Sequence, residues 1–295
     1  MLLEQTPNWL VSMFEDKGWS SAIDTYYDRE LQRFSVRTDA RYVNTSYGKT
    51  HVLTAGRADA PPLVLLHGRG VNATVWRDYI ADHADTHRIY AIDVNGEGGK
   101  SAPQHPFTWG IGYAAWLVEV FKQLRVEKAQ VVGMSFGGWL ALKLAAHAPQ
   151  RVASLSLLAP AGFVWAGLDF VRRGMHAALF PQAERTRRFI EFLSSPDAQI
   201  SEDDCHLLHM LFSHHHTNPE PPPPFSDACL RRLTMPTQII IGAEDHVFAA
   251  QPVVTRAQRV LPNLAQATIL PGLNHDLLSE RGRAARERVR EFVGV

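Results

Sequence analysis

Residues 131–140 read VVGMSFGGWL, in which an apolar run meets a serine between glycines and a second apolar run begins. Gly133, Ser135 and Gly137 fit the pattern G-x-S-x-G. Where this pattern is catalytic, the serine occupies a strained turn from a strand into a helix, and the small neighbours allow the close packing that keeps its hydroxyl exposed. A purely structural glycine-serine turn has the same letters. The rest of the chain must therefore decide whether Ser135 is a nucleophile.

Short apolar runs on both sides of this stretch alternate with helical patterns. Runs typical of buried strands are LVLLHG (63–68), HRIYAIDV (87–94), AQVVGMS (129–135), VASLSLLAP (152–160), TQIIIGAED (237–245) and ATILPG (267–272). Two further β segments are expected within 41–56, around the turn residues Ser46-Tyr47-Gly48. The alternation predicts an α/β fold with a mostly parallel central sheet and helices on both faces.

The alternation stops between residues 160 and 230, where helical patterns and a proline-rich run, PEPPPP, replace it. We predict that 160–230 is a helical cap inserted after the sixth strand. The core then comprises 1–159 and 231–295, with an N-terminal helical extension over about 1–32. Within that extension an amphipathic helix is expected at 8–32. Its candidate apolar contacts are Trp9, Leu10, Met13, Phe14 and Trp19.

Composition excludes several classes of protein. Among 295 residues, Lys+Arg and Asp+Glu both number 30, so no basic excess predicts binding to nucleic acid or to an anionic membrane. The chain has no apolar run of about 18 residues and no secretory pattern at its start, so we expect neither a membrane span nor export. Two cysteines suit a reducing compartment, and we expect a cytoplasmic protein. Its partner should be a small molecule, neutral or apolar.

A nucleophilic serine needs a base, and the base needs an acid that orients it. His275 lies in the loop after the last predicted strand, and Asp245 lies in the loop after the strand before it. Open α/β sheets place their sites at the carboxyl ends of strands, so we expect both residues near Ser135. Either residue alone is as well explained by an exposed loop. Glu244 is the alternative acid, although Asp245 better fits a G-x-x-D loop counted from Gly242.

The loop after LVLLHG is the candidate for the oxyanion-binding part of an acyl-transfer site. Backbone N–H groups must meet the oxyanion where its charge develops. We expect one N–H from Phe136, directly after the serine, and one from Arg69, because Gly68 and Gly70 allow the backbone around it to bend. A plain glycine turn is the alternative, and the direction of the Arg69 side chain is open. His67 is expected to be a structural residue beside the site.

Two segments resemble sites of other kinds. GEGGKS ends like a phosphate-binding P-loop, but Val94 replaces its first glycine, and Pro103 and Pro106 preclude an immediate helix. We therefore expect no nucleotide site. His206 and His209 precede a run of three histidines, but no set of Cys or carboxylate residues completes a zinc spacing, so we expect no metal site.

In this order, LVLLHGRG, AIDVNGEGGKS, GMSFGG, GAEDHVF and GLNHDL resemble the α/β-hydrolase fold superfamily in its form with a helical cap. The beginning of the chain is similar to bacterial carboxylesterases of the naproxen-esterase type (carboxylesterase NP). The resemblance implies Ser135 as nucleophile, Asp245 as acid and His275 as base, in the family's chain order, with no cofactor. Two positions depart from common patterns: Arg69 stands where an aromatic or small residue is frequent, and Asn95 stands where an arginine is usual.

The expected activity is hydrolysis of a carboxylic ester, and two other reactions that use the same triad are the alternatives. Such reactions are the cleavage of a C–C bond in a meta-cleavage product and the transfer of an acyl group to an acceptor other than water. Relatives that open epoxides or remove halides carry an aspartate in the elbow, so Ser135 argues against both activities. A non-catalytic binding protein of the same fold is a further alternative, although it has no need of all three residues. Substrate identity and oligomeric state are left open.

Overall fold

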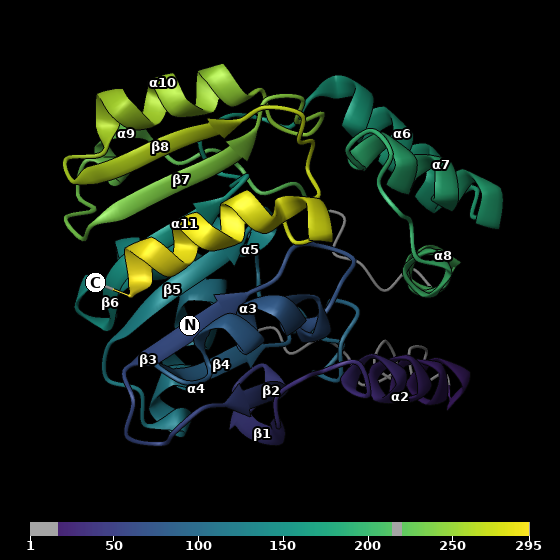
Figure 1. Ribbon diagram of the computed structural model, residues 1–295, viewed down its shortest axis with the longest axis horizontal. Coiled ribbons are helices and arrows are strands. Elements are labelled where there is room, and N and C mark those ends of the chain that lie inside the picture. Colours follow the sequence, from purple (N-terminus) through teal and green to yellow (C-terminus); the bar gives the residue numbers. More distant parts are fainter. Residues whose placement is uncertain (1–16, 214–219, 295) are drawn as a thin grey trace, which may run out of the picture.

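The computed structural model describes residues 17–213 and 220–294. Eight strands form one sheet in the order β1-β2-β4-β3-β5-β6-β7-β8 (Figure 1). β2 pairs antiparallel with β1 and with β4, and every other neighbouring pair is parallel. The strands are β1 (Asp39–Thr45), β2 (Gly48–Ala55), β3 (Pro62–Leu66), β4 (Arg88–Ile92), β5 (Ala129–Met134), β6 (Val152–Leu158), β7 (Thr237–Gly242) and β8 (Leu264–Leu270). The predicted mostly parallel sheet is confirmed.

Helices cover both faces of the sheet, which explains why its central strands are apolar along their length. Every residue of β4 and of β7 is buried. α3 (Arg77–His83) and α11 (Arg283–Val293) contact each other in front of the strands in Figure 1. α4 (Gly112–Leu124) and α5 (Phe136–His147) pack together on the opposite face, and α10 (Ala250–Val260) covers β7 and β8. No helix in the part of the chain that the structure describes is long and apolar enough to cross a membrane.

The chain between β6 and β7 forms the inserted helices. Figure 1 shows α6, α7 and α8 set apart from the sheet, beyond one end of its strands. Ala177, Phe189 and Phe212 give these three helices a small apolar core of their own. The inserted helices are α6 (Leu168–Leu179), α7 (Ala183–Leu193), α8 (Glu202–Ser213) and the short α9 (Asp227–Leu230). The helical insertion after the sixth strand is thus confirmed, and we refer to 160–230 as the cap.

The N-terminal helix α2 (Lys17–Leu31) lies against α8 of the cap. Tyr26 Oη donates to Asp204 Oδ1 at 2.9 Å, and Ile23 shares an apolar cluster with Leu207 and Leu211. The described part of the segment expected to be helical at 8–32 is helical over Lys17–Leu31, and residues 8–16 lie outside the described residues. Trp9, Leu10, Met13 and Phe14, four of its expected contacts, lie outside the described residues, and so does the side chain of Trp19.

Candidate active site

Ser135 occupies the turn between β5 and α5 in a backbone conformation that side chains rarely adopt. Its φ is 53° and its ψ is −112°, which for a residue other than glycine is a strained conformation. The two glycines of the motif are required by packing. A Cβ atom on Gly137 would lie 1.9 Å from the Leu66 carbonyl oxygen, and one on Gly133 would lie 2.4 Å from that of Gly137. The sequence motif therefore forms the sharp strand-to-helix turn that exposes a serine hydroxyl.

His275 and Asp245, predicted as base and acid, lie in contact. His275 Nδ1 is 2.8 Å from Asp245 Oδ2, and the exposed fractions of the two side chains are 12% and 0%. The second oxygen, Asp245 Oδ1, accepts the N–H groups of Val247 and Phe248 at 2.8 Å each. Since both of its oxygens accept, the carboxylate has a fixed orientation toward the imidazole. Glu244, the alternative acid, is exposed to solvent.

The loop after β3 lies directly against the serine. A Cβ atom on Gly68 would lie 3.5 Å from Ser135 Cβ. Gly70 has a positive φ of 68°, and its N–H donates to Glu97 Oε2 at 3.1 Å. Phe136 is the first residue of α5, so its N–H has no acceptor within the helix. The two segments predicted to bind an oxyanion, at Arg69 and Phe136, therefore flank Ser135.

The Arg69 side chain is turned toward the beginning of α5. Its guanidinium carbon lies 4.4 Å from the centroid of the Phe136 ring, and its Nη2 donates to the carbonyl of Glu220. Arginine over an aromatic ring is a favourable cation–π arrangement. The guanidinium thus links the loop after β3, the helix that follows the serine, and the returning end of the cap.

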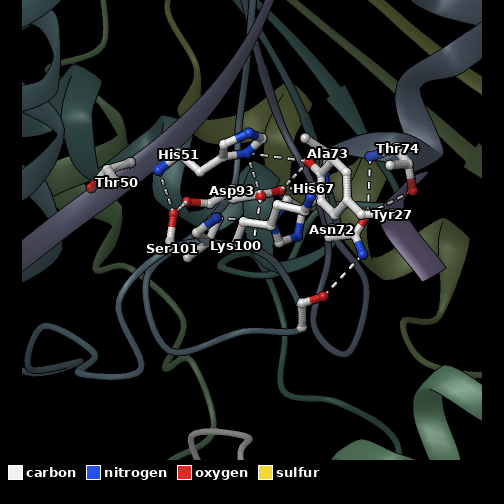
Figure 2. Close-up of polar contacts among 12 residues, drawn as sticks. Tyr27, Thr50, His51, His67, Asn72, Ala73, Thr74, Asp93, Lys100 and Ser101 are labelled. Atoms are coloured by element: carbon white, nitrogen blue, oxygen red, sulfur yellow. Dashed lines mark hydrogen bonds and ion pairs between the residues drawn. The ribbon is translucent and has the colours of Figure 1, made fainter. Parts of the chain in front are cut away.

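Buried Asp93, which follows β4, organises the backbone around these loops (Figure 2). Its carboxylate accepts the N–H groups of Ala73 at 2.7 Å and Lys100 at 2.9 Å. It also contacts His51 Nδ1 at 2.8 Å and the Tyr27 hydroxyl at 3.0 Å. Burial alone would raise the pKa of Asp93, but the contacts with His51 and the backbone donors hold it below its ordinary value. An ionised carboxylate therefore joins α2, β2 and two loops.

His67 joins the loops after β3 and β4, and Asn95 supports the loop after β4. His67 Nε2 accepts the N–H of Val94 at 2.9 Å, and its Nδ1 donates to the Gly68 carbonyl at 2.7 Å. Burial lowers the pKa of His67, which favours this neutral form. Asn95 accepts from the Thr50 hydroxyl at 2.8 Å and donates to a backbone carbonyl at 2.8 Å. The expectation that His67 is structural agrees with these contacts, and Asn95 ties its loop to β2.

The glycine-rich segment that resembles a P-loop encloses a carboxylate of the protein itself. The GEGGKS loop wraps around Asp93, and a Cβ atom on Gly99 would lie 2.4 Å from the Asp93 carboxyl carbon. A carboxylate thus occupies the space beside the glycines, and Lys100 pairs with Asp24 and Asp28 of α2. Within 17–213 and 220–294, no group of His, Cys, Asp or Glu could hold a metal ion. The histidine run at 214–216 lies outside the described residues.

Sequence reasoning named the residues at the centre of the site but missed the polar residues that support them. Asp93 precedes the glycine-rich loop, Glu97 lies within it, and Asn274 directly precedes His275. All three are buried. Their adjacency to motif residues was the only signal, because the groups that they contact are far away in the sequence.

Comparison with known proteins agrees with this architecture. Residues 61–188 match the alpha/beta hydrolase fold family. The chain is 30% identical over 285 residues to the Bacillus subtilis (strain 168) protein named "Uncharacterized carboxylesterase nap", covering 91% of each chain. It is 28% identical to carboxylesterase YbfK of the same organism, covering 90% of this chain and 92% of that one. The crystal structure of naproxen esterase (carboxylesterase NP) from Bacillus subtilis is similar with a TM-score of 0.84 at 27% identity, covering 92% of this chain and 97% of that chain. The chain belongs to the alpha/beta hydrolase fold family.

Proposed function

We propose that this protein hydrolyses carboxylic esters with Ser135, His275 and Asp245 as its catalytic triad. The observation that carries the proposal is the 2.8 Å contact of His275 Nδ1 with the buried Asp245 carboxylate. A histidine oriented by a carboxylate is what a serine nucleophile requires. Ser135, Asp245 and His275 follow parallel strands of one sheet, whose carboxyl ends meet at one edge. The two relatives named as carboxylesterases support the same reaction.

In the proposed first step, Ser135 Oγ attacks the ester carbonyl carbon while His275 Nε2 takes the hydroxyl proton. Asp245 accepts the hydrogen bond from Nδ1 and stabilises the imidazolium that forms. The N–H groups of Phe136 and Arg69 bind the oxyanion of the tetrahedral intermediate. His275 then returns the proton to the departing alcohol, which leaves the acyl group on Ser135. In the second half, His275 activates a water molecule that releases the acid.

The substrate in this proposal is a small ester with an apolar portion. The aromatic side chains nearby belong to the core: the Phe248 ring lies 5.8 Å from the His275 ring, Phe136 stacks on Trp139 at 5.6 Å, and all three are buried. The proposal keeps the predicted division of the chain into a core of 1–159 and 231–295 and a cap of 160–230. A cytoplasmic location and the absence of a cofactor accompany the proposal as predictions.

Two other reactions would use the same groups. A C–C bond hydrolase would need His275 and Ser135 for a diketone substrate, and an acyltransferase would hand the acyl group to an acceptor while excluding water. Both share the acyl-transfer geometry, so only the substrate separates them from an esterase. A non-catalytic binding protein has no need of a buried acid aligned with a histidine.

The test is labelling with a fluorophosphonate probe, followed by a panel of p-nitrophenyl esters of increasing acyl length and a screen of meta-cleavage diketones. We expect Ser135 to be labelled and short esters to be cleaved. Ser135→Ala is the control that must lose the label. Absence of labelling in the wild-type protein would refute the serine mechanism. Labelling without ester cleavage would refute the esterase and favour the C–C bond hydrolase or the acyltransferase.

A further inference from the structure

The end of α7 in the cap is joined to the loop that carries His275. The backbone carbonyls of Phe192, Leu193 and Ser194 all accept hydrogen bonds from the loops after β7 and β8. One of these donors is the N–H of His275 itself, which lies 3.2 Å from the Leu193 carbonyl. The proposed base is therefore bound to the inserted helices as well as to Asp245.

Asn274 is the centre of this junction. Its side-chain NH₂ donates to the Phe192 carbonyl at 2.9 Å and to the Ser194 carbonyl at 3.0 Å. Its Oδ1 accepts the N–H groups of His246 and His275, each at 2.9 Å. These four contacts use both donors and both acceptor sites of the amide. If the side-chain amide were turned over, its NH₂ would face two N–H groups and its oxygen would face two carbonyls. The hydrogen-bond partners therefore fix which atom of the Asn274 amide is nitrogen and which is oxygen.

Ser195 makes a second connection across the same junction. Its hydroxyl accepts the N–H of Asn274 at 2.9 Å and donates to Asp276 Oδ1. Both neighbours of His275 in the sequence are thus tied to the cap. Asn274 is 2% exposed and Ser195 is 4% exposed, so water does not replace these contacts while the cap is seated.

We propose that Asn274 is a positioning residue that couples the contact of the cap with the core to the alignment of His275. The Asn274 side-chain oxygen joins the loop after β7, which carries Asp245, to the loop after β8, which carries His275. The side-chain nitrogen binds both loops to the end of α7. When the cap moves away, the amide loses two acceptors, and the His275 backbone loses the Leu193 carbonyl. The base is then aligned only when the cap is closed over the site. This inference rests on the proposed function, because it gives His275 the role of base.

Asn274→Asp tests the contacts of Asn274 with the cap apart from its contacts with the two loops of the core. The carboxylate keeps acceptors for His246 and His275 but faces the carbonyls of Phe192 and Ser194 without a proton to donate. We expect kcat per fluorophosphonate-titrated serine to fall by about 10²-fold, since misplacing a catalytic group by about 1 Å has that cost. Hydrogen exchange should accelerate at residues 189–195 while the central strands keep their protection. Ser195→Ala should produce the same pattern more weakly.

Asn263→Asp is the matched control, because Asn263 donates to the Thr234 carbonyl at 3.1 Å in an exposed position. It should change neither quantity. Faster exchange at 189–195 with unchanged kcat in Asn274→Asp would overturn the coupling, and so would a loss of kcat with unchanged exchange. If Asn274→Asp does not fold, Ser195→Ala decides by the same two readouts. Failure of wild-type labelling would refute the proposed function by itself, and exchange at 189–195 would still show whether Asn274 joins the cap to this loop.

Discussion

The nucleophile side and the base side of the candidate site are held by different parts of the molecule. Ser135 and the backbone of the loop at Arg69 are fixed from within the core, by glycine packing in the elbow and by the buried carboxylate of Asp93, although the Arg69 side chain also donates to the Glu220 carbonyl of the cap. The loop of His275 is instead fastened to carbonyl groups at the end of α7, which belongs to the cap. Changes in the core should therefore damage the nucleophile side together with folding. Changes in the cap should reach the base side and leave the core intact.

Ser135→Ala has the largest expected effect, because it removes the proposed nucleophile without disturbing either set of supporting contacts. We expect kcat toward a short p-nitrophenyl ester to fall by about 10³-fold or more. The melting temperature should not fall, since a strained serine is replaced by a smaller residue that makes no new contact. Ser46→Ala, in the exposed turn between β1 and β2, is the control and should retain full activity. Residual activity above a tenth of wild type would contradict the assignment of Ser135.

Gly137→Ala tests whether the nucleophile side is inseparable from the core. The new Cβ would lie 1.9 Å from the Leu66 carbonyl oxygen, so the backbone must move. We expect the free energy of unfolding to fall by about 3 kcal/mol, as for severe overpacking. Denaturant titration measures this loss. Gly167→Ala, in the cap, is the matched control: its nearest atom would be 3.5 Å away and its φ is −60°, so it should have little effect. Equal stability of the two variants would refute the packing argument.

The same division explains what the sequence could predict. The elbow could be found because Gly133, Ser135 and Gly137 are constrained by each other within five residues. The contact of His275 with Asp245 followed from strand order, since both lie after neighbouring parallel strands. The contacts of Asn274 could not be predicted, because its acceptors lie about eighty residues away in a cap that has no motif.

Tyr27→Phe tests how far the core support extends into the N-terminal helix. The Tyr27 hydroxyl donates to Asp93 Oδ1 at 3.0 Å in a fully buried position. Loss of a hydrogen bond to a buried charge should lower the free energy of unfolding by about 2 kcal/mol. Tyr26→Phe is the matched variant, because its hydroxyl donates to Asp204 of the cap at 2.9 Å. We expect it to loosen α8 in hydrogen exchange and to cost less global stability. If Tyr26→Phe lowered the free energy of unfolding more than Tyr27→Phe, the claim that α2 supports mainly the core would be refuted.

Glu97→Gln tests, through the pH dependence of stability, whether Glu97 carries a charge beside the loop of Arg69. Glu97 is 5% exposed and accepts the N–H of Gly70, next to the proposed oxyanion donor. Burial raises its pKa from 4.5 to about 7, although the charge of Arg69 and the hydrogen bond from Gly70 act in the opposite direction. Among the described residues its Oε1 has no hydrogen-bond partner, so a glutamine oxygen can keep the Gly70 contact while the substitution changes mainly the charge.

The sign follows from the raised pKa. The folded state holds a proton on Glu97 that the unfolded chain releases near pH 4.5, so this stabilisation is complete below pH 4.5 and is lost as the pH rises through about 7. Between pH 6 and 8 we expect the stability of wild type relative to Glu97→Gln to fall by about 1 kcal/mol. Denaturant titrations of both proteins at each pH give this difference, in which the contributions of the buried histidines cancel. A difference that does not change with pH would show that Glu97 is ionised throughout, and that the loop of Arg69 is supported by a permanent charge like the one on Asp93.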